Sequence, residues 1–408
     1  MNPSPQTVRR TFGLETVRSV AVGVQETAFQ TFAILIALKH FESGPAVKSL
    51  ILASQAVGLI GSLFIIPWVQ RSSIRLNHAA AGISFVAAIG FIVAALSKNS
   101  EIGFLGGMSV GFICMALPMP LQTQLLRQNY PDKQRGRLFS ITILARAISA
   151  MAFSYFGGLW LEGNMEKFPL LLVCFAVATL VSTVCFIFLP SPKIDKSIAA
   201  NAPRVSVFYS MRWLRDDAQF RIVIFAAMAM GFGFLPAIAL RVEYLANPVH
   251  GISLDIGTIA FLTGVLPSLA RMGSTFFWGW LFDRMQVFRL RGIVNLCFLA
   301  GILTYFTTPV YGMLVAGSII FGIARGGGEI LWNLWVTKLA KPEHVGEYMS
   351  VHTFLTGIRA LIAPFFGFYL ADLISVKAVV VSSSLLIGLS VIILIPLMKR
   401  GVLAGRQK

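Results

Sequence analysis

The sequence predicts an all-α membrane protein with twelve transmembrane helices in two six-helix bundles. Of its 408 residues, 56% are hydrophobic and only 12% are charged, whereas a soluble globular chain has about 25% charged residues. Twelve apolar stretches are long enough to cross a bilayer core, which takes about 20 residues of helix. The longest polar interval, residues 190–219, leaves six of these stretches on each side.

The predicted helices are the apolar stretches themselves. They lie at residues 14–38, 46–69, 79–97, 102–126, 137–161, 168–189, 220–243, 255–282, 291–308, 310–337, 347–372 and 376–398. The start, MNPSPQTVRR, is polar and basic and has no small-residue cleavage site. We therefore expect the first stretch to remain as a helix rather than to be removed as a signal peptide.

The basic residues are distributed unevenly between the loops. Most of the 34 lysines and arginines fall in segments on the same side as the N-terminus, and the opposite loops hold only Lys39, Lys48, Lys98, Lys167 and Lys377. This asymmetry predicts a multi-pass protein with both termini cytoplasmic, in the plasma (inner) membrane if the source is bacterial. The net charge of +17 is then expected to orient the chain and to contact anionic lipid of the bilayer, with no role in binding nucleic acid.

The polar interval predicts the division into domains. We expect an N-terminal bundle at 1–189, a cytoplasmic linker at 190–219 and a C-terminal bundle at 220–408. The second part of the linker mixes Phe208 and Trp213 with Arg212 and Arg215. That mixture is consistent either with a short helix in the headgroup layer or with a solvated linker.

The two halves carry a weak internal similarity. PDKQRGRLFSITILARAISAMAFSYFGG (131–158) parallels PEHVGEYMSVHTFLTGIRALIAPFFG (342–367). Each segment has a proline, a glycine, two apolar residues before Ser140 or Ser350, an arginine at 146 or 359, and a closing Phe-Gly pair. The similarity predicts two six-helix units related by duplication.

The loop GWLFDRMQVFRLRG (279–292) carries a family resemblance. Together with the six-plus-six pattern, its Gly279, Asp283 and Arg284 resemble the G-x-L-x-D-R signature of the major facilitator superfamily. The first-half loop, IPWVQRSSIRLN (66–77), departs from that signature, with Arg71 opposite Asp283. The resemblance implies that the first, fourth, seventh and tenth helices line a central cavity, that the second, fifth, eighth and eleventh join the halves, and that the others face lipid.

Ionisable residues lie near the middle of several predicted helices. They are Glu26, Arg146, Arg271, Arg325, Glu329 and Arg359. Charged groups at such depth cost several kcal/mol each, so they normally face protein or a wet cavity. Arg241 lies near a helix end, from which its side chain is expected to reach water.

These charges have structural and functional interpretations. Arg325 and Glu329 are spaced to neutralise each other on one helix face. Glu26 either neutralises an arginine or carries a coupling proton, and Arg146, Arg271 and Arg359 either hold the halves together or contact substrate. Because arginines outnumber carboxylates here, the group favours a small organic anion, which guanidinium groups bind in bidentate geometry. A buried glutamate that binds and releases a proton would couple transport to a proton gradient.

The segment GIARGGGEILWNLW (322–335) combines charge with three consecutive glycines. The glycines either let the helix bend or unwind, or allow close helix packing. Arg325, Glu329, Trp332 and Asn333 fall on roughly one side, where Trp332 either stacks on a flat substrate or fills the wall. Gln122, which follows the kink-prone LPMP (117–120), adds a neutral donor for a polar solute.

The resemblance also predicts a cytoplasmic gate that contains Gly279, Asp283 and Arg284. In the superfamily the loop acid meets the start of a helix in the other half, where the positive end of the helix favours it. Asp283 is then expected to pair with Arg135 or Arg137. In the second cluster both charges have exchanged sides, so Arg71 or Arg75 is expected to pair with Glu343 or Glu347. The alternative is that these are ordinary exposed loop charges, worth about 0–1 kcal/mol a pair.

The sequence therefore predicts a secondary active transporter that works by alternating access, as a proton-coupled symporter or antiporter for a small polar and anionic solute. One alternative is an exporter of drugs or other amphiphiles, and another is a non-transporting membrane sensor or assembly partner. The sequence has no phosphate-binding loop, metal-ligand motif or nucleophile–base spacing. We therefore expect that the protein is not an enzyme and that it uses no cofactor. We expect the chain to function as a monomer.

Overall fold

The computed structural model describes residues 3–72, 74–191, 207–250, 252–341 and 344–405. Within this part of the chain every regular element is a helix and no strand occurs. The described residues include twelve helices that are long and apolar enough to cross a membrane. The predicted fold class is confirmed.

The helices group into two compact units. Unit 1 contains residues 1–203 and 254–265, and unit 2 contains residues 204–253 and 266–408. The eighth span is thus divided, because its first turns pack with unit 1 and the remainder belongs to unit 2.

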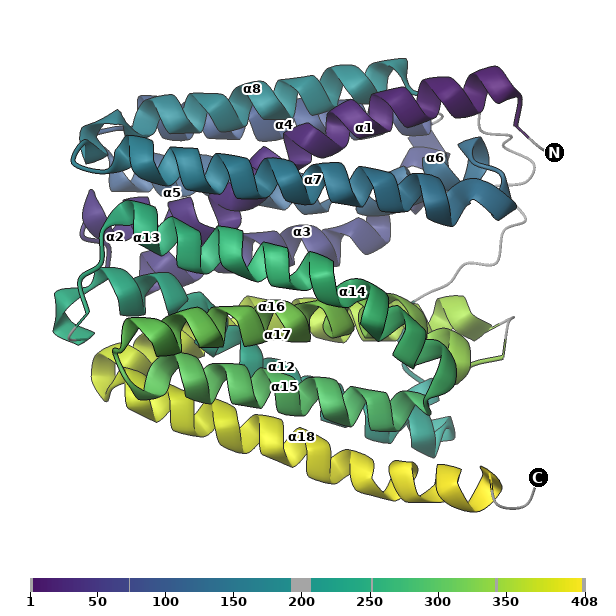
Figure 1. The fold of residues 1–408 in the computed structure, drawn as a ribbon. Coiled ribbons are helices and arrows are strands. Elements are labelled where there is room, and N and C mark those ends of the chain that lie inside the picture. The colour runs from purple at the N-terminus through teal and green to yellow at the C-terminus, as the bar shows by residue number, and fades with distance from the viewer. Residues whose placement is uncertain (1–2, 73, 192–206, 251, 342–343, 406–408) are drawn as a thin grey trace. The chain divides into compact units, whose positions relative to one another are not determined.

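The helices of unit 1 run roughly alongside one another (Figure 1). Its helices are α1 (Pro5–Thr27), α2 (Ala33–Lys39), α3 (Pro45–Ser72), α4 (Leu76–Leu96), α5 (Glu101–Ala116), α6 (Met119–Asn129), α7 (Asp132–Leu161), α8 (Phe168–Phe188) and α13 (Ile256–Ala260). A π-helical turn, Ala28–Phe32, joins α1 to α2, and a second one, Phe261–Val265, follows α13. Helix α4 packs on α5 and α8, α1 packs on α7 and α8, and α13 packs on α7.

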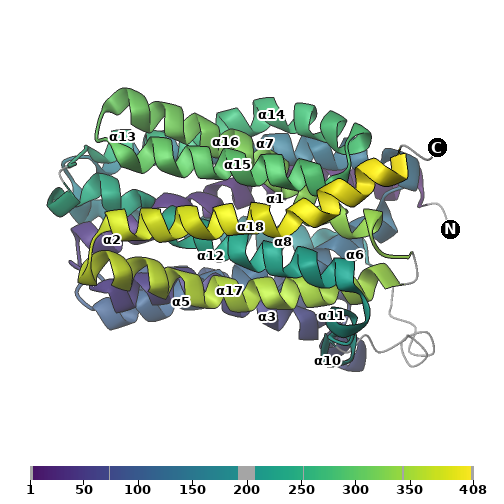
Figure 2. The same ribbon diagram turned by 90° about the horizontal axis from the view of Figure 1, so that it is seen from below.

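Unit 2 contains the remaining described helices. These are α10 (Val207–Ser210), α11 (Trp213–Asp216), α12 (Ala218–Ala246), α14 (Leu266–Arg284), α15 (Val287–Thr307), α16 (Tyr311–Leu334), α17 (Val345–Leu373) and α18 (Val376–Gly405). Helix α18 packs on both α12 and α15, as Figure 2 shows. Helix α16 packs on α14 and α15, and α12 packs on α17.

Small residues let some of these helices meet backbone to backbone. A Cβ atom placed on Gly90 of α4 would lie within 3.0 Å of the Gly111 amide nitrogen and the Gly107 carbonyl oxygen of α5. Any larger side chain would push these two helices apart. Such contacts provide the close van der Waals packing that holds helices together in lipid, where the hydrophobic effect gives no drive for association.

The first span begins earlier than the apolar pattern predicts, at Pro5 rather than near residue 14. The Ser4 hydroxyl accepts a hydrogen bond from the Thr7 amide at 3.2 Å and caps the helix, and Pro5 takes the first helical position. Both features favour a helix start. Arg18, which the charge pattern assigns to a cytoplasmic segment, therefore lies well inside the helix rather than near its start.

Two other positions refine the sequence-based picture. The fourth span is interrupted after Ala116 and resumes at Met119, as the LPMP segment predicts. Arg241 does not reach water from a helix end. It is 2% exposed, and its guanidinium carbon lies 5.4 Å from the centre of the Phe321 ring.

The described part of the linker forms short helices that dock on α17. The Phe208 ring lies 6.1 Å from that of Phe354, and the Trp213 ring lies 4.9 Å from that of Tyr348. Residues 192–206 of the predicted linker lie outside the described residues. The amphipathic pattern near Trp213 is therefore used, at least in part, to pack against protein.

Candidate functional site

In unit 1, Glu26 of α1 pairs with Arg146 of α7. The Arg146 Nε donates to Glu26 Oε2 at 2.8 Å, and Gln30 Nε2 donates to the other carboxylate oxygen at 2.8 Å. The glutamate side chain is 12% exposed, and the arginine side chain is 43% exposed. Gly23 allows this approach, because a Cβ there would clash with the Arg146 carbonyl oxygen. In this conformation the Glu26 carboxylate neutralises Arg146.

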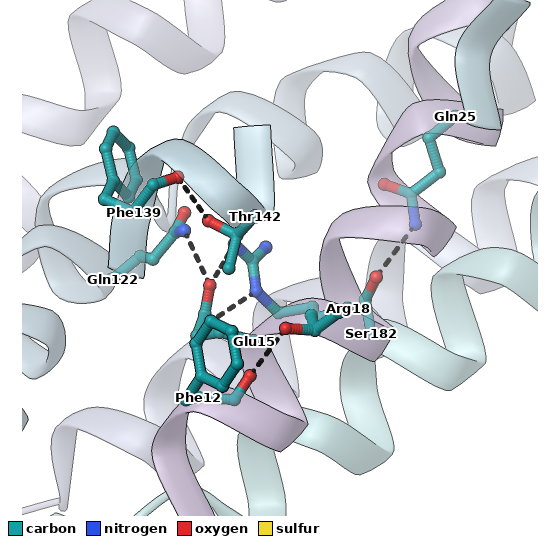
Figure 3. A network of polar contacts seen from close by, with 9 residues as sticks. Phe12, Glu15, Arg18, Gln25, Gln122, Phe139, Thr142 and Ser182 are labelled. Carbon is teal, nitrogen blue, oxygen red and sulfur yellow. Dashed lines mark hydrogen bonds and ion pairs between the residues drawn. The ribbon is translucent and has the colours of Figure 1, made fainter. Parts of the chain in front are cut away.

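A second acid–base pair in unit 1 is more completely buried, and the sequence did not single it out. Arg18 donates from Nε and Nη2 to the two carboxylate oxygens of Glu15, at 2.8 and 2.9 Å. Gln122 Nε2 donates to the same carboxylate at 3.3 Å, which joins α6 to α1 (Figure 3). The two charged side chains are only 2% and 8% exposed. Both lie near the start of the first predicted stretch, 14–38, so the apolar pattern places them in a helix but does not show that they are buried together.

In unit 2, Arg271 of α14 pairs with Glu329 of α16. The Arg271 Nη1 donates to Glu329 Oε1 at 2.7 Å. The arginine side chain is 11% exposed, and the glutamate side chain is 46% exposed. Arg325, one turn before Glu329, is half-buried. The carboxylate of Glu329 therefore joins two helices, in addition to its predicted relation to Arg325 on its own helix.

The glycine triplet lies within an unbroken helix, since α16 runs from Tyr311 to Leu334. A Cβ on Gly326 would lie within 3.0 Å of the Ser274 hydroxyl of α14, and one on Gly327 would lie equally close to Val294 of α15. Gly322, one turn earlier, similarly faces the Pro267 carbonyl oxygen. In this conformation the glycines serve close helix packing.

Arg359 of α17 has a different environment from Arg146, its counterpart in the internal similarity. Its Nη1 donates to the Ala227 carbonyl oxygen of α12. Its guanidinium occupies the space that a side chain at Gly231 would fill. Its Nε is buried and has no hydrogen-bond partner among the described residues. Arg146 thus meets a carboxylate, whereas Arg359 donates to a main-chain carbonyl oxygen.

An aromatic cluster in unit 2 surrounds His352, which the sequence did not single out. The Trp332 ring lies 4.3 Å from the imidazole, and Trp335 Nε1 donates to His352 Nδ1 at 3.5 Å. The guanidinium carbon of Arg291 lies 5.5 Å from the centre of the Trp335 ring. Trp332, a predicted substrate contact, therefore stacks on protein here.

The predicted gate is described only in part. The side chains of Arg71, Arg135, Arg137 and Glu343, and that of the predicted cavity residue Asn333, lie outside the described residues. Asp283 is exposed, and the guanidinium carbon of Arg284 lies 4.4 Å from the centre of the Trp280 ring. Among the described residues outside its own stretch of helix, only the Ile330 side chain would lie within 4 Å of a Cβ atom placed on Gly279.

Glu347, the other described acid of the gate, has partners within unit 2. It accepts hydrogen bonds from Arg212 Nη2 at 3.3 Å and from Trp213 Nε1, and it lies 3.5 Å from His344 Nδ1. Its carboxylate therefore fixes the linker helix α11 to the start of α17.

The family follows from comparison with known sequences. The family model described as Major Facilitator Superfamily matches residues 19–364 and 222–405. The chain belongs to this superfamily. The resemblance inferred from the loop signature and the six-plus-six pattern is thereby confirmed, and the protein is an integral multi-pass membrane transporter.

Solved structures share the fold at low sequence identity. A point mutant of the nucleoside transporter NupG superposes with a TM-score of 0.74 at 12% identity, covering 96% of this chain and 99% of that chain. The D-xylose–proton symporter gives 0.70 at 14% identity, with 95% and 97% covered. The human organic anion transporter MFSD10 (TETRAN) gives 0.61 at 14% identity, with 97% and 100% covered. No curated protein matches the sequence.

Proposed function

We propose that this transporter is a proton-coupled secondary carrier that works by alternating access and moves a small, polar, anionic solute. The observation that carries the anion preference is the environment of Arg359. Its Nε has no hydrogen-bond partner among the described residues, and its Nη1 donates to a neutral carbonyl oxygen. A buried guanidinium without a carboxylate retains the cost of its charge, which an anionic ligand would offset.

The other central arginines support the same preference less directly. Arg146 and Arg271 are matched by Glu26 and Glu329, so protonation or displacement of either carboxylate would release a guanidinium for substrate. The fold similarity leaves the solute open, because neighbours with this fold are described as carriers of nucleosides, D-xylose and organic anions.

The anion preference is tested by ligand-induced stabilisation of the purified protein. Binding to the native state raises the unfolding midpoint by an amount that grows with ligand concentration over Kd. We expect anionic metabolites to raise it, and Arg359→Lys to weaken that response because lysine keeps the charge and loses the planar fork. Parallel Lys variants of Arg146, Arg271 and Arg325 identify any further contact. A cationic or neutral ligand, with all four variants unaffected, would exclude the proposal.

Glu26 and Glu329 are the proposed carriers of the coupling proton. Each contacts an arginine in a membrane-spanning helix, so its proton affinity depends on whether that arginine stays or moves to substrate. Glutamine keeps the shape and removes titration. We expect Glu26→Gln or Glu329→Gln to abolish uptake driven by a pH gradient in proteoliposomes while preserving substrate exchange; full uphill uptake by both variants would remove these residues from the coupling.

We further propose that both termini are cytoplasmic, that the protein is a monomer, and that its domains are 1–189, 190–219 and 220–408, as the sequence predicts.

We also propose that the predicted cytoplasmic gate forms. The gate would pair Asp283 with Arg135 or Arg137, and Arg71 or Arg75 with Glu343 or Glu347. Charge reversal tests the second cluster. Arg71→Glu should change the labelling of cytoplasmic-side cysteines, and adding Glu347→Arg should restore it. Unchanged labelling in both variants would refute the gate.

A further inference from the structure

A cavity of about 520 Å³ lies at one end of unit 1, apart from the central charges. It is bounded by the starts of α1 and α4, the end of α6 and the segment that follows α8. The side chains that give it chemical character are those of Thr7, Arg10, Arg75, Asn77, His78 and Asn129. Because all of these belong to one unit, the cavity is a feature of that unit alone.

The cavity is basic. Arg10 and Arg75 contribute two guanidinium groups and His78 contributes an imidazole, whereas the described lining residues include no carboxylate. Charge-assisted hydrogen bonds from arginine are the strong ones, and a planar guanidinium matches the oxygens of a phosphate.

The start of α4 adds main-chain donors to this wall. Arg75 occupies the N-cap position with an extended backbone, and its side chain does not cap the helix. The first N–H groups of a 21-residue helix therefore point to the end where Arg75, Asn77 and His78 line the cavity. A helix N-terminus of this kind favours an anion through its exposed N–H groups and its dipole.

Two asparagines make the wall rigid. Asn77, which is 4% exposed, donates from Nδ2 to the carbonyl oxygens of Ile187 and Leu189 at 3.0 and 3.2 Å. Asn129 donates to the Pro190 carbonyl oxygen at 2.8 Å. The Asn77 Oδ1 is buried and has no hydrogen-bond partner among the described residues.

The position of the cavity in the fold indicates where its ligand comes from. Residues of two span starts, at Pro5 and Leu76, and of two span ends, at Asn129 and Phe188, meet around it. The cavity therefore lies at the boundary between the apolar spans and the polar layer. Phospholipid headgroups, with their phosphates, occupy that layer.

We propose that this cavity binds a phosphate group, held by Arg10 and Arg75 and by the N-terminus of α4. Its source is either an anionic phospholipid headgroup or a free phosphate, and both present the same oxygens to the same donors. This site shares Arg75 with the proposed cytoplasmic gate, but none of its lining residues belongs to the acid–arginine pairs of the proposed transport site.

The test uses the purified full chain and two phosphate sources. In one arm, the protein is placed in nanodiscs of phosphatidylcholine with increasing phosphatidylglycerol, and in the other arm inorganic phosphate is titrated into protein in neutral detergent. The readout in both is the midpoint of thermal unfolding. Saturable stabilisation by phosphatidylglycerol alone identifies a lipid site, and stabilisation by inorganic phosphate identifies recognition of the free group.

The variants separate this site from general attraction of charge. A basic residue near an anionic membrane surface contributes about a fivefold change in affinity, so Arg10→Gln and Arg75→Gln should each raise the half-saturating concentration about fivefold or more. Arg9→Gln is the matched control, because Arg9 is an exposed neighbour on the same helix and does not line the cavity. An equal effect of Arg9→Gln, or no saturable response to either probe, overturns the proposal.

Discussion

The packing of Arg359 against Gly231 gives the sharpest prediction for the site. In the Gly231→Ala variant, the added Cβ would lie within 3.0 Å of the Nε, Cζ and Cδ atoms of Arg359. The guanidinium must then leave the Ala227 carbonyl oxygen, which it reaches by Nη1. Loss of a hydrogen bond from a charged group costs about 1.5–3 kcal/mol. The better helix propensity of alanine returns about 1 kcal/mol, so we expect a net loss of about 0.5–2 kcal/mol.

The assay is thermal unfolding of the purified protein, with Gly273→Ala as control. Gly273 lies in α14, and apart from its own stretch of helix no atom of the described residues lies within 4 Å of its ideal Cβ position, so that variant should be neutral or slightly stabilising. In an Arg359→Met background, Gly231→Ala should lose most of its cost, because the flexible thioether side chain accommodates the methyl group. Equal midpoints for Gly231→Ala and Gly273→Ala, or an unchanged cost without the guanidinium, would refute the proposed packing.

Three further predictions concern other parts of the molecule. Glu15→Gln should destabilise the protein by about 3–5 kcal/mol because it leaves Arg18 buried without its carboxylate. The control is Glu166→Gln, which removes an exposed pair with Lys98 and should leave the unfolding midpoint unchanged. Equal midpoints for the two variants would contradict the proposed role of the buried pair. Gly322→Ala should lower the stability of the protein by about 1–3 kcal/mol, because its Cβ would clash with the Pro267 carbonyl oxygen. The control is Gly312→Ala, whose Cβ would meet no neighbouring atom of the described residues within 4 Å. A loss of stability no greater than that of the control would contradict the close contact of α14 with α16. Glu347→Gln should weaken the hold on α11 and speed tryptic cleavage after Arg212 and Arg215, which would stay unchanged if the Glu347 contacts did not fix this segment.

The membrane spans were predictable because length and apolarity alone determine them. A stretch of about 20 apolar residues has few alternatives to a helix in a bilayer. The start of the first helix was not predictable from apolarity, because its opening turns are polar. They are stabilised by the Ser4 cap and by the pair of Glu15 with Arg18. The burial of Arg241 under Phe321 also depends on a distant helix.

The charged residues in the middle of the spans can be recognised from the sequence, but their pairing cannot. Charged residues in apolar stretches are visible in the sequence, and their depth marks them as functional candidates. Glu26 and Arg146 are 120 residues apart, and Arg271 and Glu329 are 58 apart. Sequence spacing indicates only local partners such as Arg325 and Glu329, so the choice of carboxylate for each arginine requires the packing of the helices. Arg291 and His352 were not singled out because Arg291 lies in the basic loop 279–292 and His352 belongs to no metal-ligand motif.

The central claim, proton-coupled movement of an anion, is tested most directly by uphill uptake in sealed proteoliposomes. The protein is reconstituted and given an anionic solute that stabilises it, at equal concentration on both sides, and a pH gradient is then imposed. We expect the solute to accumulate on one side of the membrane, above its concentration on the other side. A protonophore should abolish this accumulation, and Arg359→Lys should reduce it. Accumulation that ignores the pH gradient, or a transported solute that is cationic or uncharged, would contradict it.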